Sequence, residues 1–227
     1  MRDIVYILKD EDATQELRYS LRSVEANFPH RYVWFVGGCP KGLKPDRVLK
    51  HKQTGVNKWE RIRSSMYEVI KQEELTDEFY LFNDDFFVMK PFKGEFINYV
   101  DCTLNDRINE FKDENNMNNY ARTLVDVRNE LAAQGYNTMN FEVHMPMLFK
   151  KAEVYEAVKK CLSPQMRSIY GNVTGCRYIQ HKDVKVHQVD VVPKDADFIS
   201  TSNRTFAYGQ VGAYIRQVFD KESKYEQ

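Results

Sequence analysis

Three continuous runs of four or five apolar residues, separated by segments with helical periodicity, constrain the fold of this chain most. The runs occupy residues 4–8, 32–36 and 79–82, and apolar residues recur at helical spacing in the intervening segments 15–26 and 57–70. Runs of this kind are typical of strands that are covered on both faces. Strands that alternate with helices indicate an α/β fold with a mostly parallel, Rossmann-like sheet covered by helices. In such sheets, ligands bind beyond the carboxyl ends of the strands.

Weaker patterns fill the rest of the chain. We expect the strand of residues 79–82 to break at a polar turn and to resume at 86–89, with further extended segments near 48–49, 141–146 and 184–192. Helices are expected at residues 120–134, 152–162 and 211–219. The polar stretch within residues 100–135 predicts an inserted helical lobe or a mobile loop in one domain that spans residues 1–227.

Composition excludes several classes of protein. The 33 basic and 33 acidic residues balance to a formal net charge of zero, so any site for an anion must be local. No stretch approaches the roughly 18–20 apolar residues of a membrane helix, and the chain begins with a strand-like run instead of a signal peptide, which predicts a cytoplasmic protein. The four cysteines form no C-x-x-C pair, and the glycine-rich nucleotide motifs and the G-x-S-x-G motif of serine hydrolases are absent from the sequence.

The strongest local signal is the turn Asn83-Asp84-Asp85 between two apolar runs. A turn that serves only solubility does not require two acids flanked by bulky side chains. Carboxylate and amide oxygens are ligands for the hard cations Mg²⁺ and Mn²⁺, and such a cation would bridge the phosphate oxygens of a sugar donor. The alternative is an ordinary turn at a strand end, where Asn and Asp are common.

Further residues extend this candidate site. His144 precedes Met145-Pro146, where the backbone is restricted, and its imidazole would ligate the same metal or act as an acid or base, although a lone histidine is more often structural. Basic residues on the first two helices and an acid after the first strand would contact phosphates or hydroxyls: Arg18, Arg22, Lys58, Arg61, Arg63 and Asp10. The alternative for these residues is a solvated surface. His181 and His187 are expected to be structural.

Three segments resemble the Stealth family of sugar-phosphate transferases, which acts in capsule synthesis and includes the lysosomal-enzyme N-acetylglucosamine-1-phosphotransferase. Residues 17–24 (LRYSLRSV) with Pro29 and residues 79–87 resemble that family's second conserved region, and residues 144–146 (HMP) resemble its third. The family's opening Trp-Val-Asp is present only as residues 4–10 (IVYILKD), and its Thr-Phe-Asn-Ser element is replaced by residues 54–58 (TGVNK). Residues 198–226 resemble a group of bacteriophage-type glycosyltransferases. The resemblance implies a GT-A-like fold for a nucleotide-diphosphate sugar, with a metal-binding acidic turn at a strand end.

Together, the residues and the resemblance predict a metal-dependent glycosyltransferase that moves a sugar from a nucleotide-diphosphate sugar to an acceptor hydroxyl. A uridine diphosphate (UDP) sugar is the expected donor. The predicted ligands of Mg²⁺ or Mn²⁺ are Asn83, Asp84, Asp85 and His144; the predicted catalytic residues are Asp84, Glu142 and His144; and the predicted donor-binding residues are Asp10, Arg18, Arg22, Lys58 and Arg63.

The acceptor is left open by the sequence, with a glycan, a wall polymer, a protein and a modified DNA base as candidates. One alternative function is a Stealth-like hexose-1-phosphate transfer to a polysaccharide or glycan. Another is a non-catalytic module that binds a carbohydrate or a nucleotide. A phage-encoded protein of this kind would act in the cytoplasm of its bacterial host.

Overall fold

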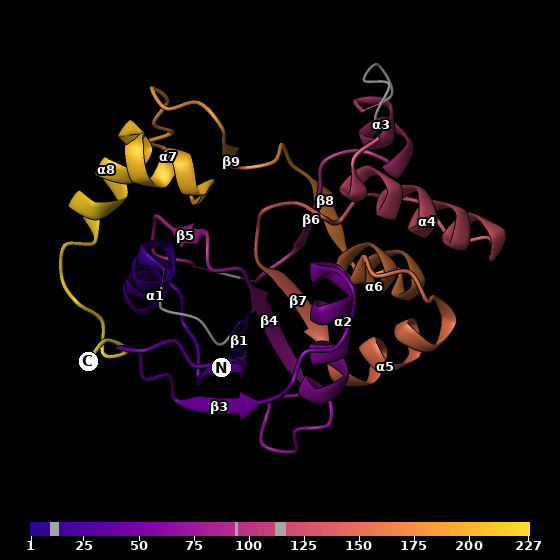
Figure 1. The fold of residues 1–227 in the computed structure, drawn as a ribbon, viewed down its shortest axis with the longest axis horizontal. Coiled ribbons are helices and arrows are strands. Elements are labelled where there is room, and N and C mark those ends of the chain that lie inside the picture. The colour runs from indigo at the N-terminus through magenta and orange to yellow at the C-terminus, as the bar shows by residue number, and fades with distance from the viewer. Residues whose placement is uncertain (10–13, 94, 112–116) are drawn as a thin grey trace.

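The computed structural model describes residues 1–9, 14–93, 95–111 and 117–227 (Figure 1). Its strands are β1 (Asp3–Leu8), β2 (Val33–Gly37), β3 (Arg47–Lys50), β4 (Glu78–Phe82), β5 (Phe86–Val88), β6 (Asn98–Val100), β7 (Met147–Lys150), β8 (Tyr178–Gln180), β9 (Lys185–Val186) and β10 (Phe198–Thr201). Its helices are α1 (Gln15–Asn27), α2 (Lys58–Val69), α3 (Leu104–Asn109), α4 (Asn119–Ala133), α5 (Lys151–Lys160), α6 (Met166–Thr174), α7 (Asn203–Tyr208) and α8 (Gln210–Val218).

A five-stranded sheet forms the centre of the molecule, in the order β3-β2-β1-β4-β7. The pairs β3–β2, β2–β1 and β1–β4 are parallel, and β7 is an antiparallel edge strand beside β4. Helices α1 and α2 begin where the sequence predicts, and the side chains of Thr14 and Asn57 cap their amino ends. The expected α/β fold with a mostly parallel, helix-covered sheet is therefore confirmed.

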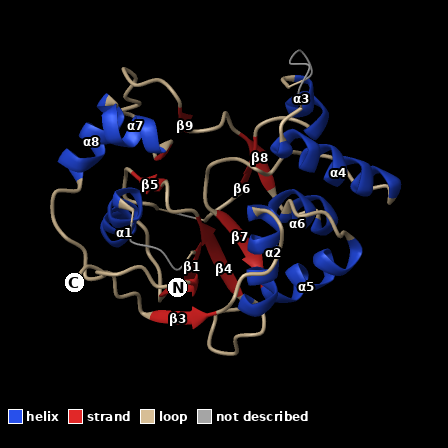
Figure 2. Ribbon diagram, viewed as in Figure 1, coloured by secondary structure: helices blue, strands red, loops and turns tan. Residues whose placement is uncertain are grey.

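Alternate residues of the central strands belong to two separate hydrophobic cores. Tyr6, Phe35 and Phe82 point into one core together with α1, whereas Val5 and Leu81 point into the other with α2, α5 and α6. Figure 2 shows these helices on the two sides of the red strands. Burial on both faces explains why the strands are continuous apolar runs, since neither side contacts water.

A second, three-stranded sheet in the order β5-β10-β9 departs from the sequence prediction. β5 does not continue the central sheet, because it pairs antiparallel with β10. Its other edge is bound by α1: Ser20 Oγ donates to Phe86 O at 2.6 Å, and Val88 N donates to Ser23 Oγ at 3.0 Å. Helices α7 and α8 pack against this sheet in a separate core that includes Phe87 and Ile199. The turn at 83–85 therefore connects two sheets.

The second half of the chain also corrects two other predictions. Residues 141–146 are irregular, and the strand begins only at Met147. The alternating segment 184–192 contributes only β9, because Val189 and Val191 are 37% and 40% exposed and gain no buried face. Within residues 100–135 the structure has helices α3 and α4, which share a hydrophobic core with α5 and α6.

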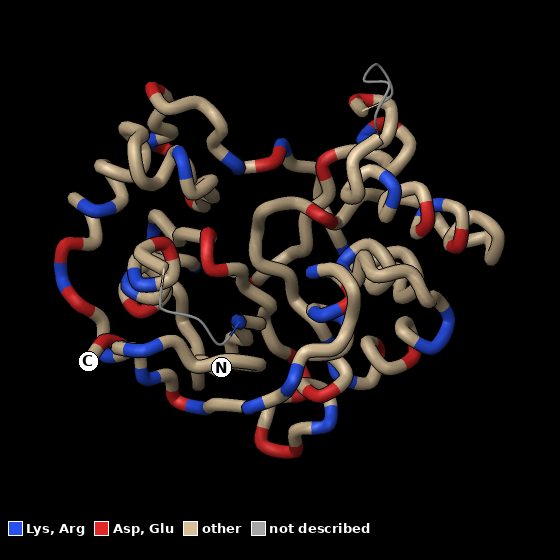
Figure 3. Tube along the Cα trace, viewed as in Figure 1, with Lys and Arg blue, Asp and Glu red and all other residues tan. Residues whose placement is uncertain are grey.

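Basic and acidic residues are interspersed along the trace, without a large block of one sign (Figure 3). Among the helices that the structure describes, none combines the length and the apolar character needed to span a bilayer. The interspersed charges agree with the equal numbers of basic and acidic residues in the chain.

Arg63 lies on the buried face of α2, where it joins two parts of the fold. Its guanidinium donates to the carbonyl oxygens of Val158, Cys161 and Ser163 at 2.7, 2.6 and 2.5 Å. The carbonyls at the end of a helix have no partners within the helix, and they carry the negative end of its dipole. Arg63 therefore caps α5, and its predicted contact with a phosphate is replaced by this structural role.

We expect Arg63→Met to lower the free energy of unfolding by about 3 kcal/mol, because buried carbonyls would lose charged donors. Urea unfolding followed by circular dichroism measures this loss. Arg61→Met on the same helix is the matched control, since the Arg61 guanidinium donates to an exposed carbonyl, that of Gly55, at 3.2 Å. The free energy of unfolding of Arg61→Met should fall by less than roughly 0.5 kcal/mol. Equal losses in both variants would contradict the capping role.

Candidate functional site

The turn Asn83–Asp85 lies at the carboxyl end of β4, beside the end of β1. The chain runs from β1 through β2 to β3 on one side and then crosses through α2 to β4 on the other side of β1. The gap between β1 and β4 is thus the point where the strand order reverses, and ligands bind at such points in open α/β sheets. Among the cavities that adjoin the turn, one of about 350 Å³ contains Asp84 and another of about 360 Å³ contains Asn83.

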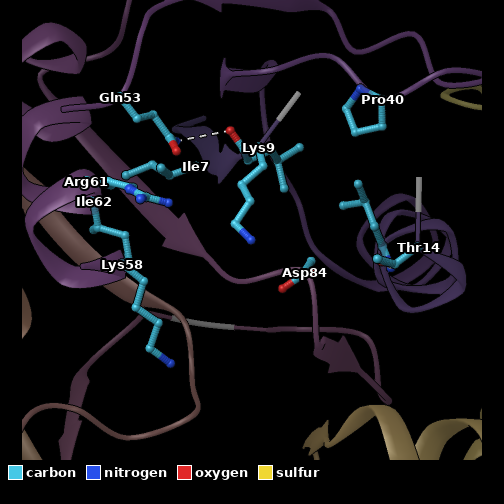
Figure 4. Close-up of a pocket in the computed structure, with 11 residues that line it drawn as sticks. Ile7, Lys9, Thr14, Pro40, Gln53, Lys58, Arg61, Ile62 and Asp84 are labelled. Carbon is cyan, nitrogen blue, oxygen red and sulfur yellow. Dashed lines mark hydrogen bonds between the residues drawn. The ribbon is translucent and has the colours of Figure 1, made fainter. Parts of the chain in front are cut away.

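The first cavity, which we call the basic cleft, has a volume of about 350 Å³ and combines three cations with one carboxylate. Its charged lining residues are Lys9, Lys58, Arg61 and Asp84. Figure 4 shows the Lys9 side chain directed toward the Asp84 carboxylate, with Lys58 and Arg61 on the α2 side. Burial and the neighbouring Asp85 carboxylate raise the pKa of Asp84 above its usual range. The cleft suits an anionic ligand that brings a cation with it.

The basic cleft continues across the carboxyl ends of β1, β2 and β3. A neighbouring cavity of about 480 Å³ shares Leu8, Lys9 and Gln53 with it. Lys50, His51 and Lys52 also line this extension. Nε2 of His51 is buried and has no hydrogen-bond partner among the described residues. The extension therefore offers a buried polar atom and further positive charge beside the strand ends.

Asp85 is held by the second sheet. Its Oδ2 accepts hydrogen bonds from Lys185 Nζ of β9 at 2.7 Å and from Ser200 Oγ of β10 at 3.1 Å. Its Oδ1 is buried without a hydrogen-bond partner in the described part of the chain. Burying a carboxylate oxygen without a partner is costly, so this atom is a natural place for a cation.

Glu16 adds a third carboxylate close to the turn. It is 6% exposed and accepts a hydrogen bond from Thr201 Oγ1 at 2.7 Å. Burial, together with the carboxylates of Asp85 and Asp84, raises its pKa to about 7. Glu16 therefore exchanges its proton near neutral pH, next to the turn.

The second cavity, which we call the aromatic cavity, has a volume of about 360 Å³ and lies on the other side of the turn. Its lining consists of Lys58, Trp59, Asn83, Arg107, Phe111, Tyr120, Glu142, Val143, His144, Arg167, Asp183, Lys185 and His187. Nδ1 of His144 lies 2.7 Å from Asp183 Oδ2. Arg167, 7% exposed, donates to Met145 O at 2.6 Å and to Asn83 Oδ1 at 3.2 Å. Buried arginine contacts thus hold the loop before β7 against the turn.

The carboxylates of Asp84 and Asp85 fit a divalent cation. The described residues contain no group of three or more His, Cys, Asp and Glu side chains that would hold a metal ion by themselves. Mg²⁺ commonly uses only one or two carboxylates, with substrate phosphates and waters as its other ligands. The structure does not bring His144 into such a group with the two acids, and Asp183 already occupies its Nδ1.

Most of the predicted basic residues lie elsewhere. Arg18 donates to Gly42 O at 3.2 Å, and Arg22 binds both carboxylate oxygens of Glu226 at 2.7 Å. The Arg18 contact ties α1 to the loop between β2 and β3, the Arg22 contact ties α1 to the C-terminal segment, and Arg63 caps α5. Of the predicted donor-binding residues, Lys58 lines both cavities beside the turn. Asp10 lies outside the described residues.

Several residues of the site carry no signal in the sequence. Glu16 appears as one polar position of an amphipathic helix, and Arg167 belongs to α6, which we did not predict. Lys185 lies in the segment 184–192 that we predicted as a strand, and Asp183 directly precedes it. His187, expected to be structural, lines the aromatic cavity. These residues share only their proximity to the turn in space. A single sequence does not show which distant residues lie close together in the fold.

The raised pKa of Glu16 predicts a pH-dependent stability. The folded protein binds this proton more tightly than the unfolded chain, whose glutamate has an ordinary pKa of about 4.5, so this group's stabilising contribution falls as pH rises from 4.5 to 7. We expect Glu16→Gln, which still accepts the bond from Thr201, to gain stability relative to wild type between pH 5 and pH 8. Between these two pH values, the free energy of unfolding of Glu16→Gln should increase relative to that of wild type by on the order of 3 kcal/mol. Urea unfolding at both pH values tests this, and a difference that does not change with pH would contradict the assignment.

Comparisons with known proteins do not assign the chain to a family. No protein-family model matches the chain, and a search of curated proteins found no match. The likeness to the Stealth family therefore stays a prediction from three short segments.

Proposed function

We propose that this protein is a metal-dependent, GT-A-like glycosyltransferase that uses a nucleotide-diphosphate sugar. The observation that supports it is the position of the Asn83–Asp85 turn. It lies at the reversal of strand order, between a basic cleft and an aromatic cavity. A transferase must hold an anionic donor and a second substrate on two sides of one reacting centre, and this arrangement provides both places.

The basic cleft is the proposed donor site. Lys9, Lys58 and Arg61 would contact the diphosphate, because lysine and arginine are the usual phosphate ligands of proteins. The nucleoside would lie in the extension along β2 and β3, with the buried Nε2 of His51 in reach of a polar group. Aligned in this way, the donor places its sugar at the Asp84 end of the cleft.

Asp84 and Asp85 are the residues that would hold Mg²⁺ or Mn²⁺. When bound, the cation would offset the negative charge that develops on the departing diphosphate. The protein's own contribution is to keep both carboxylates in place: Lys185 and Ser200 fix Asp85, and the sheets on either side fix the backbone of the turn. Preorganised charges of this kind need no rearrangement during the reaction.

A thermal-shift screen of UDP-sugars with and without Mn²⁺ tests the proposal. A donor at about 100 times its dissociation constant adds about 2.7 kcal/mol to the folded state. For a domain of this size the melting temperature should rise by about 5–10 °C. We expect Asp84→Asn to abolish the Mn²⁺-dependent part of that shift and to lower sugar transfer at least 100-fold.

Asp77→Asn is the matched control, because Asp77 precedes the opposite end of β4 and its side chain is 99% exposed. This variant should keep both the shift and the transfer. The nucleotide released in a turnover distinguishes the alternatives: UDP supports glycosyl transfer, and uridine monophosphate supports hexose-1-phosphate transfer. Donor binding that persists in Asp84→Asn, with no turnover in wild type, would identify a binding module instead.

A further inference from the structure

We propose that the aromatic cavity binds a neutral sugar as the acceptor and that His144, held by Asp183, removes the proton from its attacking hydroxyl. This inference rests on the proposed glycosyltransferase function, and it assigns the second substrate and the general base of that reaction. It depends on the wall of the cavity, its hydrogen-bonding groups and the geometry of one histidine.

Three rings form one wall of the cavity. Trp59 of α2 stacks on Tyr120 of α4 with ring centroids 5.9 Å apart and an angle of 26° between the planes. Phe111 meets Tyr120 edge-on, also at 5.9 Å. All three side chains line the cavity and are partly exposed. Flat apolar surfaces bordered by polar groups suit a sugar ring, whose faces carry C–H groups and whose rim carries hydroxyls.

The charges around the cavity favour a neutral ligand over a polyanion. Three of its four lysine and arginine side chains are engaged inside the protein: Arg107 with Asp101 and Glu110, Lys185 with Asp85, and Arg167 with the Met145 carbonyl. The fourth, Lys58, has its Nζ 5.0 Å from the centroid of the Trp59 ring. The lining also includes the carboxylates of Glu142 and Asp183, which bind Ser168 N and His144. Carboxylates accept hydrogen bonds from hydroxyls and repel the phosphates of DNA or teichoic-acid-like polymers. The cavity therefore selects a glycan among the candidate acceptors.

The position of His144 is set from two sides by one carboxylate. Asp183 accepts a hydrogen bond from His144 N at 3.1 Å with Oδ1 and contacts the ring Nδ1 at 2.7 Å with Oδ2. Burial opposes the charge of Asp183, but the bonds from His144 hold its pKa below the usual range, so it stays an acceptor. A hydrogen bond from Nδ1–H to this carboxylate places the lone pair of the neutral ring on Nε2. His144 is thereby prepared to accept a proton.

Glu142 is the weaker candidate for the base. Ser168 N, in the first turn of α6, donates to its Oε1 at 2.9 Å, and the buried Arg167 lies close enough to act on its charge. These interactions give Glu142 a structural role at the start of α6. We assign Asp183 as the positioning residue and His144 as the base.

The chemical step is a single displacement. The acceptor hydroxyl gives its proton to Nε2 of His144, and its oxygen forms a bond to the anomeric carbon of the donor sugar. The bond from that carbon to the diphosphate oxygen breaks, and its electron pair leaves with the nucleoside diphosphate. Attack from the cavity opposite the leaving group inverts the configuration at the anomeric carbon.

The acceptor site is tested with methyl glucoside, methyl galactoside and methyl N-acetylglucosaminide as probes, in saturation-transfer NMR on protein loaded with UDP and Mg²⁺, which is diamagnetic. We expect at least one probe to bind wild type and Trp59→Phe, and to lose at least tenfold in affinity in Trp59→Ala. An oligothymidine probe should not compete. Binding of the oligonucleotide in place of every glycoside would overturn the assignment of a neutral sugar.

The general base is tested by kinetics with the best probe. General-base catalysis contributes roughly 100- to 10,000-fold. We expect His144→Gln to lower kcat by at least 100-fold and Asp183→Asn by at least tenfold, with the KM for the acceptor changed less than threefold. Asp183→Glu should restore part of the rate, and NMR of the product should show inverted configuration. A retained configuration, or kcat within threefold of wild type in His144→Gln, would overturn the assignment.

Titration calorimetry of UDP with Mn²⁺ on the same variants separates this inference from the proposed function. Unchanged UDP binding together with unaffected transfer in His144→Gln refutes the base and leaves the glycosyltransferase proposal in place. Failure of wild type to bind any nucleotide refutes the proposed function itself.

Discussion

The turn Asn83–Asp85 is anchored in two sheets, and the arrangement of the candidate site depends on that connection. Hydrogen bonding in the central sheet ends at Phe82, and after the three residues of the turn the chain enters the second sheet at Phe86. The hydroxyls of Ser20 and Ser23 on α1 replace a neighbouring strand along the free edge of β5. A loop with both ends inside sheets keeps little conformational freedom, so its carboxylates are positioned before any ligand arrives.

This preorganisation has an electrostatic cost. Glu16, Asp84 and Asp85 lie close together in a partly buried region, and Lys185 donates a hydrogen bond to Asp85. Desolvation and the neighbouring carboxylates destabilise the ionised forms of Glu16 and Asp84, and this raises the pKa of each. A bound cation would lower this energy, and functional sites commonly hold charges that cost stability. The same repulsion would favour the proposed ligand with its metal ion.

The arginines show where reasoning from sequence failed. Arg18 and Arg22 are one helical turn apart and resemble a phosphate clamp, yet Glu226, about two hundred residues further along the chain, binds Arg22. Arg63 is near the amino end of a helix, as a phosphate ligand would be, but it faces the helix end of α5. Spacing along a helix defines which side chains share a face. It does not define what that face contacts, because the contact is made by a distant segment.

Local patterns in the chain were sufficient for the central strands, the first helices and the acidic turn, because burial on two faces, helical periodicity and capping act between residues close in sequence. The pairing of β5 with β10, the Asp183 contact to His144 and the Lys185 contact to Asp85 join residues 39 to about 110 positions apart. Such contacts depend on how sheets and helices pack, and many sequences with the same local pattern would pack differently. The acidic turn was therefore visible in the linear chain, whereas its partners, the cavities beside it and the contact between His144 and Asp183 arose from folding.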